Sequence, residues 1–204
     1  NLFSSGIVAL DIKTGERQWH YQFIHHDIWD WDLPNAPIIA DLPNGRKIVM
    51  SVTKQAWIYA FDRLTGEPIW PIVERPVPQG DVPGEWYSPT QPFPTRPAAF
   101  DRQGFSEDDL IDYTPALRTM ALEAVQDFRL SRTIFTPPSL QDHPDGTRGL
   151  LSLPSSTGGA NWEHSAFDPE TGIVYVPSRT QLQVLALAKN PDSDIDLSQG
   201  FGVR

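Results

Sequence analysis

Ala9-Leu-Asp-Ile-Lys-Thr-Gly-Glu-Arg-Gln-Trp19 and Ala60-Phe-Asp-Arg-Leu-Thr-Gly-Glu-Pro-Ile-Trp70 are two copies of one unit. Ala, Asp, Thr, Gly, Glu and Trp recur at identical spacing after 51 residues. A third copy, Ala166-Phe-Asp-Pro-Glu-Thr-Gly172, begins 106 residues after the second and has Val176 where the others have Trp. A period of about 50 residues is typical of propeller blades. The repeat therefore predicts an all-β architecture.

Each copy is predicted to be a β-hairpin. Apolar residues before the aspartate favour a strand, and the aspartate can accept hydrogen bonds from the amides of the turn that follows. The turn closes on a glycine with positive φ: Gly15, Gly66 or Gly172. Trp19 and Trp70 are expected to begin or lie in the return strand, where a flat side chain fills the gap between neighbouring sheets. Further strands are predicted over 47–52, 172–177 and 183–187.

Composition excludes several classes of protein. The chain has 16 Lys and Arg against 26 Asp and Glu, a net charge of −10, and no basic run, which argues against nucleic-acid binding. The absence of cysteine excludes disulfides and thiolate metal sites. No apolar run reaches the roughly 20 residues that a membrane helix needs. Because the chain starts at Asn1 without Met, we expect a fragment, with any membrane attachment coming from segments outside it.

The segment between the second and third copies is predicted to interrupt the blades. Residues 68–97 hold 9 of the 20 prolines, which argues against a regular sheet or helix and for an irregular surface or lid. Ser106 before three acidic residues, and Thr114 before Pro115, predict two helix starts.

An apolar stripe at helical spacing then predicts a helix over 115–129 that docks on the sheets as part of the core. The stripe consists of Leu117, Met120, Ala121, Ala124, Val125 and Phe128. The expected organisation is blade repeats with the functional motif over 1–70, a Pro-rich and helical insertion over 71–150, and a further blade over 151–204.

The stretch that can carry chemistry is His25-His-Asp-Ile-Trp-Asp-Trp-Asp-Leu-Pro34, which follows the first hairpin where a strand leaves for a loop. Two interpretations stay open. In the first, the stretch is an acidic loop above packed tryptophans. In the second, indole rings exclude water from one carboxylate, which then acts as a base or binds a hard cation. A zinc site from His25, His26 and Asp27 is disfavoured because adjacent residues on a strand point to opposite faces.

This motif, followed by Thr53-Lys-Gln55, the second blade copy and Gly159-Ala-Asn-Trp162, resembles the pyrroloquinoline quinone (PQQ) dependent dehydrogenases. It is most similar to their membrane-bound glucose dehydrogenase branch. The likeness continues in order through 76–80, 87–93 and 135–139, so it covers nearly the whole chain. The resemblance implies an eight-bladed β-propeller, of which this chain holds about three blades, with PQQ and a cation near the axis (Ca²⁺, Mg²⁺ or a lanthanide).

The resemblance also implies residue roles. Asp30 matches the catalytic aspartate, which contacts the metal and takes the hydroxyl proton while hydride passes to the PQQ C5 carbonyl. Lys54 matches the basic residue that bonds the quinone oxygens, and Asn161 and Trp162 match a cofactor-contacting segment of a later blade. Asp32 is a second candidate metal ligand. From the residues alone, Lys54 could equally be a solvated turn lysine and Asn161 a turn-forming residue, and the family's other metal ligands have no counterpart here.

The function implied is oxidation of a sugar or polyol hydroxyl, with electrons passed to ubiquinone, on the periplasmic side of the bacterial inner membrane. Such chemistry needs a carboxylate, because hydride leaves an alcohol carbon only as the hydroxyl proton is removed. It also needs positive charge where the quinone becomes reduced. A quinate/shikimate or alcohol dehydrogenase of the same family, and a non-enzymatic propeller scaffold that binds proteins, remain as alternatives.

Overall fold

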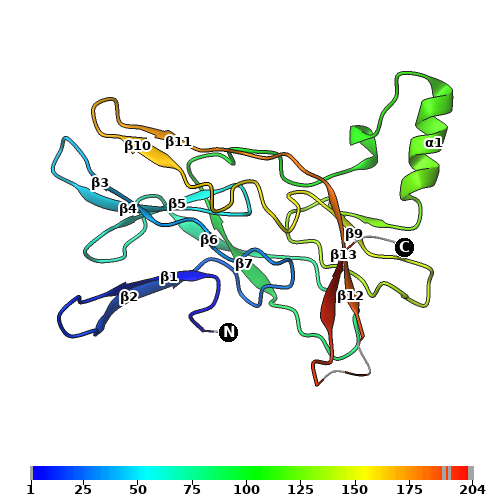
Figure 1. The fold of residues 1–204 in the computed structure, drawn as a ribbon, viewed down its shortest axis with the longest axis horizontal. Coiled ribbons are helices and arrows are strands. Elements are labelled where there is room, and N and C mark those ends of the chain that lie inside the picture. The colour runs from blue at the N-terminus through cyan, green and yellow to red at the C-terminus, as the bar shows by residue number, and fades with distance from the viewer. Residues whose placement is uncertain (1, 190–191, 193, 202–204) are drawn as a thin grey trace.

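The computed structural model describes residues 2–189, 192 and 194–201 and confirms an all-β chain (Figure 1). Its described strands form five small sheets, ordered β1-β2, β3-β4-β5, β6-β7, β10-β11 and β13-β12-β9-β8. The strands are β1 (Gly6–Leu10), β2 (Arg17–Gln22), β3 (Ile38–Asp41), β4 (Lys47–Val52), β5 (Ile58–Asp62), β6 (Ile72–Pro76), β7 (Thr90–Pro94), β8 (Arg129–Leu130), β9 (Leu150–Ser152), β10 (Ala166–Asp168), β11 (Ile173–Tyr175), β12 (Gln183–Ala188) and β13 (Ser198–Phe201). The helical elements are the 3₁₀ turn η1 (Glu107–Asp109) and the helix α1 (Pro115–Val125).

The repeated turn forms as predicted in all three copies. Asp11 Oδ1 accepts hydrogen bonds from the amides of Lys13 and Thr14, at 2.8 and 2.9 Å. Asp62 accepts in the same way from two amides, and Asp168 from one amide and one hydroxyl. The turn glycines have φ values of +73°, +76° and +72° at Gly15, Gly66 and Gly172. The aspartate and the glycine therefore fix the turn through local contacts alone.

The two repeat tryptophans behave differently. Trp19 lies in β2, its ring 5.9 Å from that of Phe61 in the next sheet, and its indole N–H donates to the carbonyl of Arg63 at 3.1 Å. It fills the gap between sheets as predicted. The prediction for Trp70 was wrong: after the second turn only a single bridge joins Phe61 to Pro68, and Trp70 lies beyond any described strand. The amide of Ile69 still donates to the Ala60 carbonyl at 2.8 Å, and the next donor in the alternating pattern would be Pro71, which has no N–H, so the return strand ends there.

The Pro-rich segment also departs from expectation, because β6 and β7 form a regular antiparallel hairpin within it. Its register runs from Ile72 opposite Pro94 to Pro76 opposite Thr90. Alternate residues of a strand direct their N–H groups to the same edge, and in a two-stranded sheet one edge is unpaired. Prolines two residues apart, Pro92 and Pro94, therefore fit without losing a ladder hydrogen bond.

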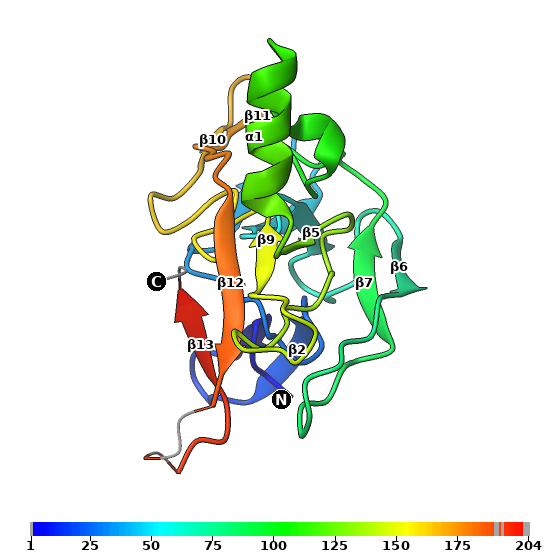
Figure 2. The ribbon, with the colours of Figure 1, turned by 90° about the vertical axis from the view of Figure 1, so that its right-hand side faces the viewer.

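Helix α1 begins as predicted but does not dock on the sheets. Thr114 Oγ1 accepts from the amide of Leu117 at 3.2 Å, yet the helix ends at Val125 and none of its residues is buried. Met120 is 64% exposed, and the helix projects away from the strands (Figures 1 and 2). Only its end, with Val125 and Phe128, packs on a small apolar cluster. Periodicity identifies an apolar face but not whether another element covers it.

The main core joins segments that are distant in sequence. Its buried residues are Phe23, Ile24, Ile28, Trp29, Trp31, Val49, Trp57, Tyr59, Phe61, Ile134, Phe135, Leu150 and Leu185. The first of these belong to the functional motif and its approach, so that loop is part of the core. The parallel pairing of β8 with β9 links the insertion to the following segment. In the described part of the chain, no helix is long and apolar enough to cross a membrane.

Candidate functional site

The loop of the motif is organised by Asp27. Its Oδ1 accepts from the amide of Trp29 at 2.9 Å, and its Oδ2 from the amide of Trp31 at 2.7 Å. Burial raises the pKa of Asp27 to about 6, against the lowering effect of these two hydrogen bonds. From the sequence, Asp27 was named only as a candidate zinc ligand, and its role in holding the loop was not predicted. Its position two residues before Trp29 is typical of an Asx turn, and that spacing was the available signal.

The two indoles lie beneath the loop. The rings of Trp29 and Trp31 stack with centroids 5.4 Å apart and planes 14° from parallel. Their N–H groups donate to the carbonyls of Thr136 and Ser155, at 2.8 and 3.1 Å. The interpretation as packed tryptophans is therefore correct for both indoles. They anchor the loop against two later segments of the chain.

Asp30 and Asp32 flank Lys54. The Lys54 ammonium donates to the backbone carbonyl of Asp30 at 2.8 Å, contacts Asp32 Oδ1, and lies 3.8 Å from Asp30 Oδ1. The Lys54 side chain is 7% exposed, whereas the Asp30 and Asp32 side chains are 46% and 61% exposed. Lys54 is thus not a solvated turn lysine, and its charge is neutralised by carboxylates that remain open to solvent.

Asp30 itself is held in an unusual state. Its φ is +63°, a left-handed conformation that non-glycine residues adopt at a cost and that is frequent at functional sites. Burial raises the pKa of Asp30 above its ordinary value, while the Lys54 charge pulls it down. The loop therefore presents a carboxylate with increased proton affinity beside a buried cation.

A second loop lies directly on Lys54. The amide of Gly159 donates to the Lys54 carbonyl at 2.8 Å. Gly158 has a φ of +79°, and a Cβ at this position would collide with the Lys54 side chain. The close approach of the two loops therefore requires glycine. The structure in this way places the loop that carries Asn161 and Trp162 beside Lys54.

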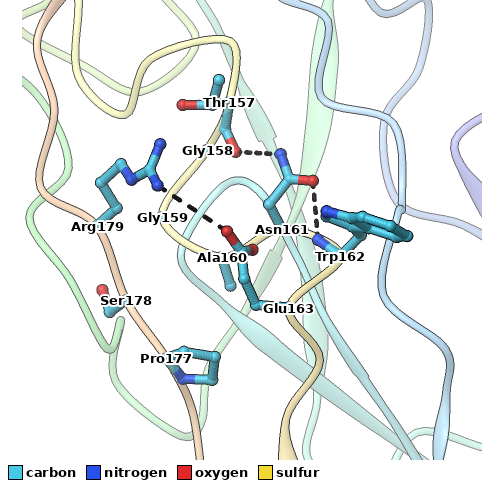
Figure 3. Close-up of a pocket in the computed structure, with 10 residues that line it drawn as sticks. All are labelled: Thr157, Gly158, Gly159, Ala160, Asn161, Trp162, Glu163, Pro177, Ser178 and Arg179. Carbon is cyan, nitrogen blue, oxygen red and sulfur yellow. Dashed lines mark hydrogen bonds and ion pairs between the residues drawn. The ribbon is translucent and has the colours of Figure 1, made fainter.

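A cavity of about 400 Å³ lies on this second loop (Figure 3). Asn161 Nδ2 donates to the carbonyl of Thr157 at 2.7 Å, and its Oδ1 accepts from the amide of Trp162 at 2.8 Å. Asn161 therefore holds its own turn, and among the described residues its second amide N–H has no partner. Trp162 is 72% exposed, and across the cavity Arg179 lies 3.9 Å from Glu163.

The two histidines of the motif contact different acids. His25 Nε2 lies 2.9 Å from Glu74 Oε1, and His26 Nε2 lies 2.7 Å from Glu85 Oε1. The buried Gln91 side chain accepts from the His25 amide at 2.8 Å and donates to its carbonyl at 2.7 Å. The histidines therefore do not converge on one zinc site. Glu74, Glu85 and Gln91 were not found from the sequence, because they lie 49 to 66 residues away and share no local pattern with the motif.

For a metal ion, the described residues offer only part of a coordination shell. No group of three or more His, Cys, Asp or Glu side chains among them is placed to hold an ion. The carboxylates of Asp30 and Asp32 present oxygens, the ligand type that hard cations prefer. This chain can thus contribute ligands to a cation without enclosing it.

Comparison with known proteins gives consistent matches along the chain. The family described as PQQ, glucose/ethanol/alcohol dehydrogenase, β-propeller domain, matches residues 1–200. The quinate/shikimate dehydrogenase (quinone) of Acinetobacter baylyi is 32% identical over 204 residues, covering 98% of this chain and 24% of that protein. The quinoprotein glucose dehydrogenase of Escherichia coli is 36% identical over 181 residues, covering 84% and 21%. A europium-containing methanol dehydrogenase has the same fold at a TM-score of 0.55 and 21% identity, over 92% of this chain and 25% of that one. The chain spans about a quarter of the length of these relatives.

Proposed function

This chain belongs to the PQQ glucose/ethanol/alcohol dehydrogenase β-propeller family, and we propose that it carries the proton-accepting part of an active site that oxidises a sugar or polyol hydroxyl. In this proposal hydride passes to PQQ and the electrons continue to ubiquinone. The observation that carries it is the Asp30–Lys54 arrangement: a carboxylate with a raised pKa and a buried ammonium, 3.8 Å apart, in one loop cluster.

The residues present fit the cofactor and a divalent cation. An ammonium has three N–H donors, and the described contacts of Lys54 direct two of them to the Asp30 carbonyl and Asp32, so one remains for a quinone oxygen. Asp30, and Asp32 through its other oxygen, can bind a hard cation such as Ca²⁺, Mg²⁺ or a lanthanide. The free amide N–H of Asn161 and the exposed Trp162 ring are the proposed cofactor contacts of the second loop. PQQ, when bound, supplies the carbonyl that accepts the hydride.

Within this arrangement Asp30 takes the proton of the reacting hydroxyl. A carboxylate is an effective base when its pKa is raised toward the working pH, and burial shifts Asp30 in that direction. The buried Lys54 charge favours negative charge on the oxygen that faces it, because an ion acts more strongly where water is excluded. The left-handed backbone of Asp30 and the bonds of Asp27 keep the carboxylate in place.

The relatives narrow the substrate to a class. Their names include quinate/shikimate, glycerol and glucose dehydrogenases, whose named substrates carry several hydroxyl groups. We therefore propose a polyhydroxylated substrate and include quinate with the sugars. The names also support a quinone acceptor, and we place the complete protein on the periplasmic side of the bacterial inner membrane. The division into blade repeats over 1–70, an insertion over 71–150 and a further blade over 151–204 is kept as a proposal.

The test is Asp30→Asn in the complete protein, reconstituted with PQQ and Ca²⁺. We expect kcat to fall about 10²- to 10⁴-fold, the usual contribution of a general base, while the PQQ absorbance of the purified protein is retained. Asp108→Asn, which removes an exposed carboxylate on η1, is the matched control and should leave kcat unchanged. Full turnover by Asp30→Asn would remove Asp30 from the role of base.

A further inference from the structure

We propose that a second cavity, beside Asp30, is a recognition subsite for the non-reacting hydroxyls of the substrate, with Glu85 and His26 as its polar wall. The inference rests on the proposed function, because it takes Asp30 as the group that meets the reacting hydroxyl. It assigns specificity for polyhydroxylated over simple alcohols to two residues outside the Asp30–Lys54 cluster.

The cavity measures about 360 Å³ and joins the motif loop to distant segments. Asp30, His26 and Glu85 are among the residues that line it, and Leu187 of β12 and Gln199 of β13 close other sides. A ligand in this space therefore contacts Asp30 and Glu85 together. Its volume suits a small molecule better than a macromolecule, since small-ligand pockets measure roughly 300 to 1,000 Å³.

Glu85 is held in a defined orientation by hydrogen bonds to only one of its two carboxylate oxygens. His26 Nε2 lies 2.7 Å from Glu85 Oε1, and the amide of Trp86 donates to the same Oε1 at 2.8 Å. Within the described residues both hydrogen bonds therefore end on Oε1, and Oε2 is left to accept from a ligand. The Glu85 side chain is 17% exposed, so this oxygen is presented from a largely buried group.

His26 is fixed by its backbone and by an aromatic neighbour. Its φ of +54° turns it away from its neighbour His25, so that the two imidazoles contact different glutamates. Its ring packs on Trp86 with centroids 4.5 Å apart. A carboxylate that is pre-oriented by an imidazole and a backbone amide loses little freedom when it binds a ligand.

The chemistry of this wall matches a hydroxyl-rich ligand. A hydroxyl both donates and accepts, so it can donate to a carboxylate oxygen, and the apolar Leu187 and Ile28 suit the carbon skeleton. A simple alcohol has only the hydroxyl whose proton Asp30 takes, and it leaves Glu85 Oε2 without a ligand hydroxyl as its partner. A site built to hydrogen-bond a substrate hydroxyl discriminates strongly against an analogue that lacks it.

The experiment compares Glu85→Gln with Glu74→Gln in the complete, PQQ-loaded protein. Glu74 is the matched control, because it forms the equivalent pair with His25 at 2.9 Å but does not line the cavity. The substrates are glycerol, propane-1,2-diol and propan-1-ol, together with glucose and quinate. We expect Glu85→Gln to lower kcat/KM for polyhydroxylated substrates roughly 10- to 100-fold, the effect of losing a charged hydrogen bond, and to leave propan-1-ol within about threefold.

A binding measurement separates this inference from the proposed function. Titration of the same polyols into the PQQ-free protein, followed by calorimetry, should give a Kd raised by Glu85→Gln and unchanged by Glu74→Gln. Such a shift in Kd, combined with no alcohol oxidation by the PQQ-loaded wild-type protein, would uphold the subsite and reject the proposed function. Equal polyol-to-alcohol ratios and equal Kd values for wild type and Glu85→Gln would overturn the subsite even where turnover is normal.

Discussion

Three carboxylates within six residues of the motif have three different environments. Asp27 is buried, and both of its carboxylate oxygens accept hydrogen bonds from backbone amides. Asp30 is half-exposed and lies next to the buried ammonium of Lys54, and Asp32 is mostly exposed and contacts the same ammonium. Their chemical identity is the same, so burial and neighbours alone assign one to structure and leave the others available to ligands. Asp27 therefore shapes the loop that carries Asp30, while its own oxygens are occupied by backbone amides.

Replacement of Asp27 by Asn should change how stability depends on pH. The folded-state pKa of about 6 lies above the unfolded value of 3.8, so the neutral carboxyl stabilises the fold below about pH 4 and that contribution is lost as pH rises through 6. Asn does not titrate and turns an NH₂ toward an amide donor, so the variant should be less stable throughout. The Tm difference from wild type should narrow between pH 4 and pH 7. A difference that widens with pH would mean that the ionised form is the stabilising one.

At the scale of elements, the sequence predicts what is fixed by local contacts. The repeated turn needs only an aspartate and a glycine within five residues, and all three copies form. Trp70, the β6–β7 hairpin and the exposed face of α1 were wrongly predicted. The position of Trp70 depends on an N–H that proline lacks, and the β6–β7 hairpin depends on an unpaired sheet edge that accommodates prolines. The exposure of α1 depends on the lack of a packing partner. None of these causes is contained in the local sequence pattern.

The turn glycines allow the local and the long-range contributions to the unfolding free energy to be separated. Gly172 has a φ of +72° and open space around it, whereas a Cβ at Gly66, with a φ of +76°, would lie 2.7 Å from the Trp19 ring. Gly172→Ala should cost about 1–2 kcal/mol of unfolding free energy for the backbone alone. Gly66→Ala should cost roughly 1–3 kcal/mol more, because Trp19 must move. Denaturant unfolding of both variants measures the difference, and equal losses would show that Trp19 adapts freely.

The candidate site was predictable only in part, for the same physical reason. Asp30 and Lys54 are 24 residues apart, and the family resemblance, not their spacing, assigned both to one site; their direct contact was not predicted. Glu85 and Gln91 reach the motif from the Pro-rich segment, which the sequence marked as irregular. Hydrogen bonds between segments 59 and 66 residues apart leave no periodic trace in the chain, so only the structure reveals them.

At the scale of the whole molecule, one short crossing segment, residues 100–104, connects separate loops through hydrogen bonds. The amide of Phe100 donates to the Ala56 carbonyl at 2.9 Å, and the Gln103 side chain donates to the Gln55 carbonyl at 2.6 Å, next to Lys54. The amide of Gly104 donates to Leu153 at 2.8 Å. Small sheets share few strand contacts, so such crossing bonds maintain the spacing of the site loops.

Asp101 lies in the same segment, makes further hydrogen bonds to another part of the chain, and provides the test at this scale. It accepts from the hydroxyls of Ser178 and Thr180, the latter at 2.5 Å, and from the amide of Arg102 at 2.7 Å. Residues 178 and 179 border the cavity on the Asn161 loop. Asp101→Ala should therefore lower the unfolding free energy by roughly 1–3 kcal/mol and accelerate amide hydrogen exchange at 157–163 and 177–180.

The matched control is Asp145→Ala, which removes an equally well-bonded carboxylate whose hydrogen bonds come from His143 and Thr147 in its own turn. It should destabilise that turn locally and leave exchange at 157–163 unaltered. If both variants changed exchange at 157–163 to the same extent, general loss of stability would explain the effect. The cavity loop would then be held by its own turn at Asn161, and the position of the site would not depend on the crossing segment.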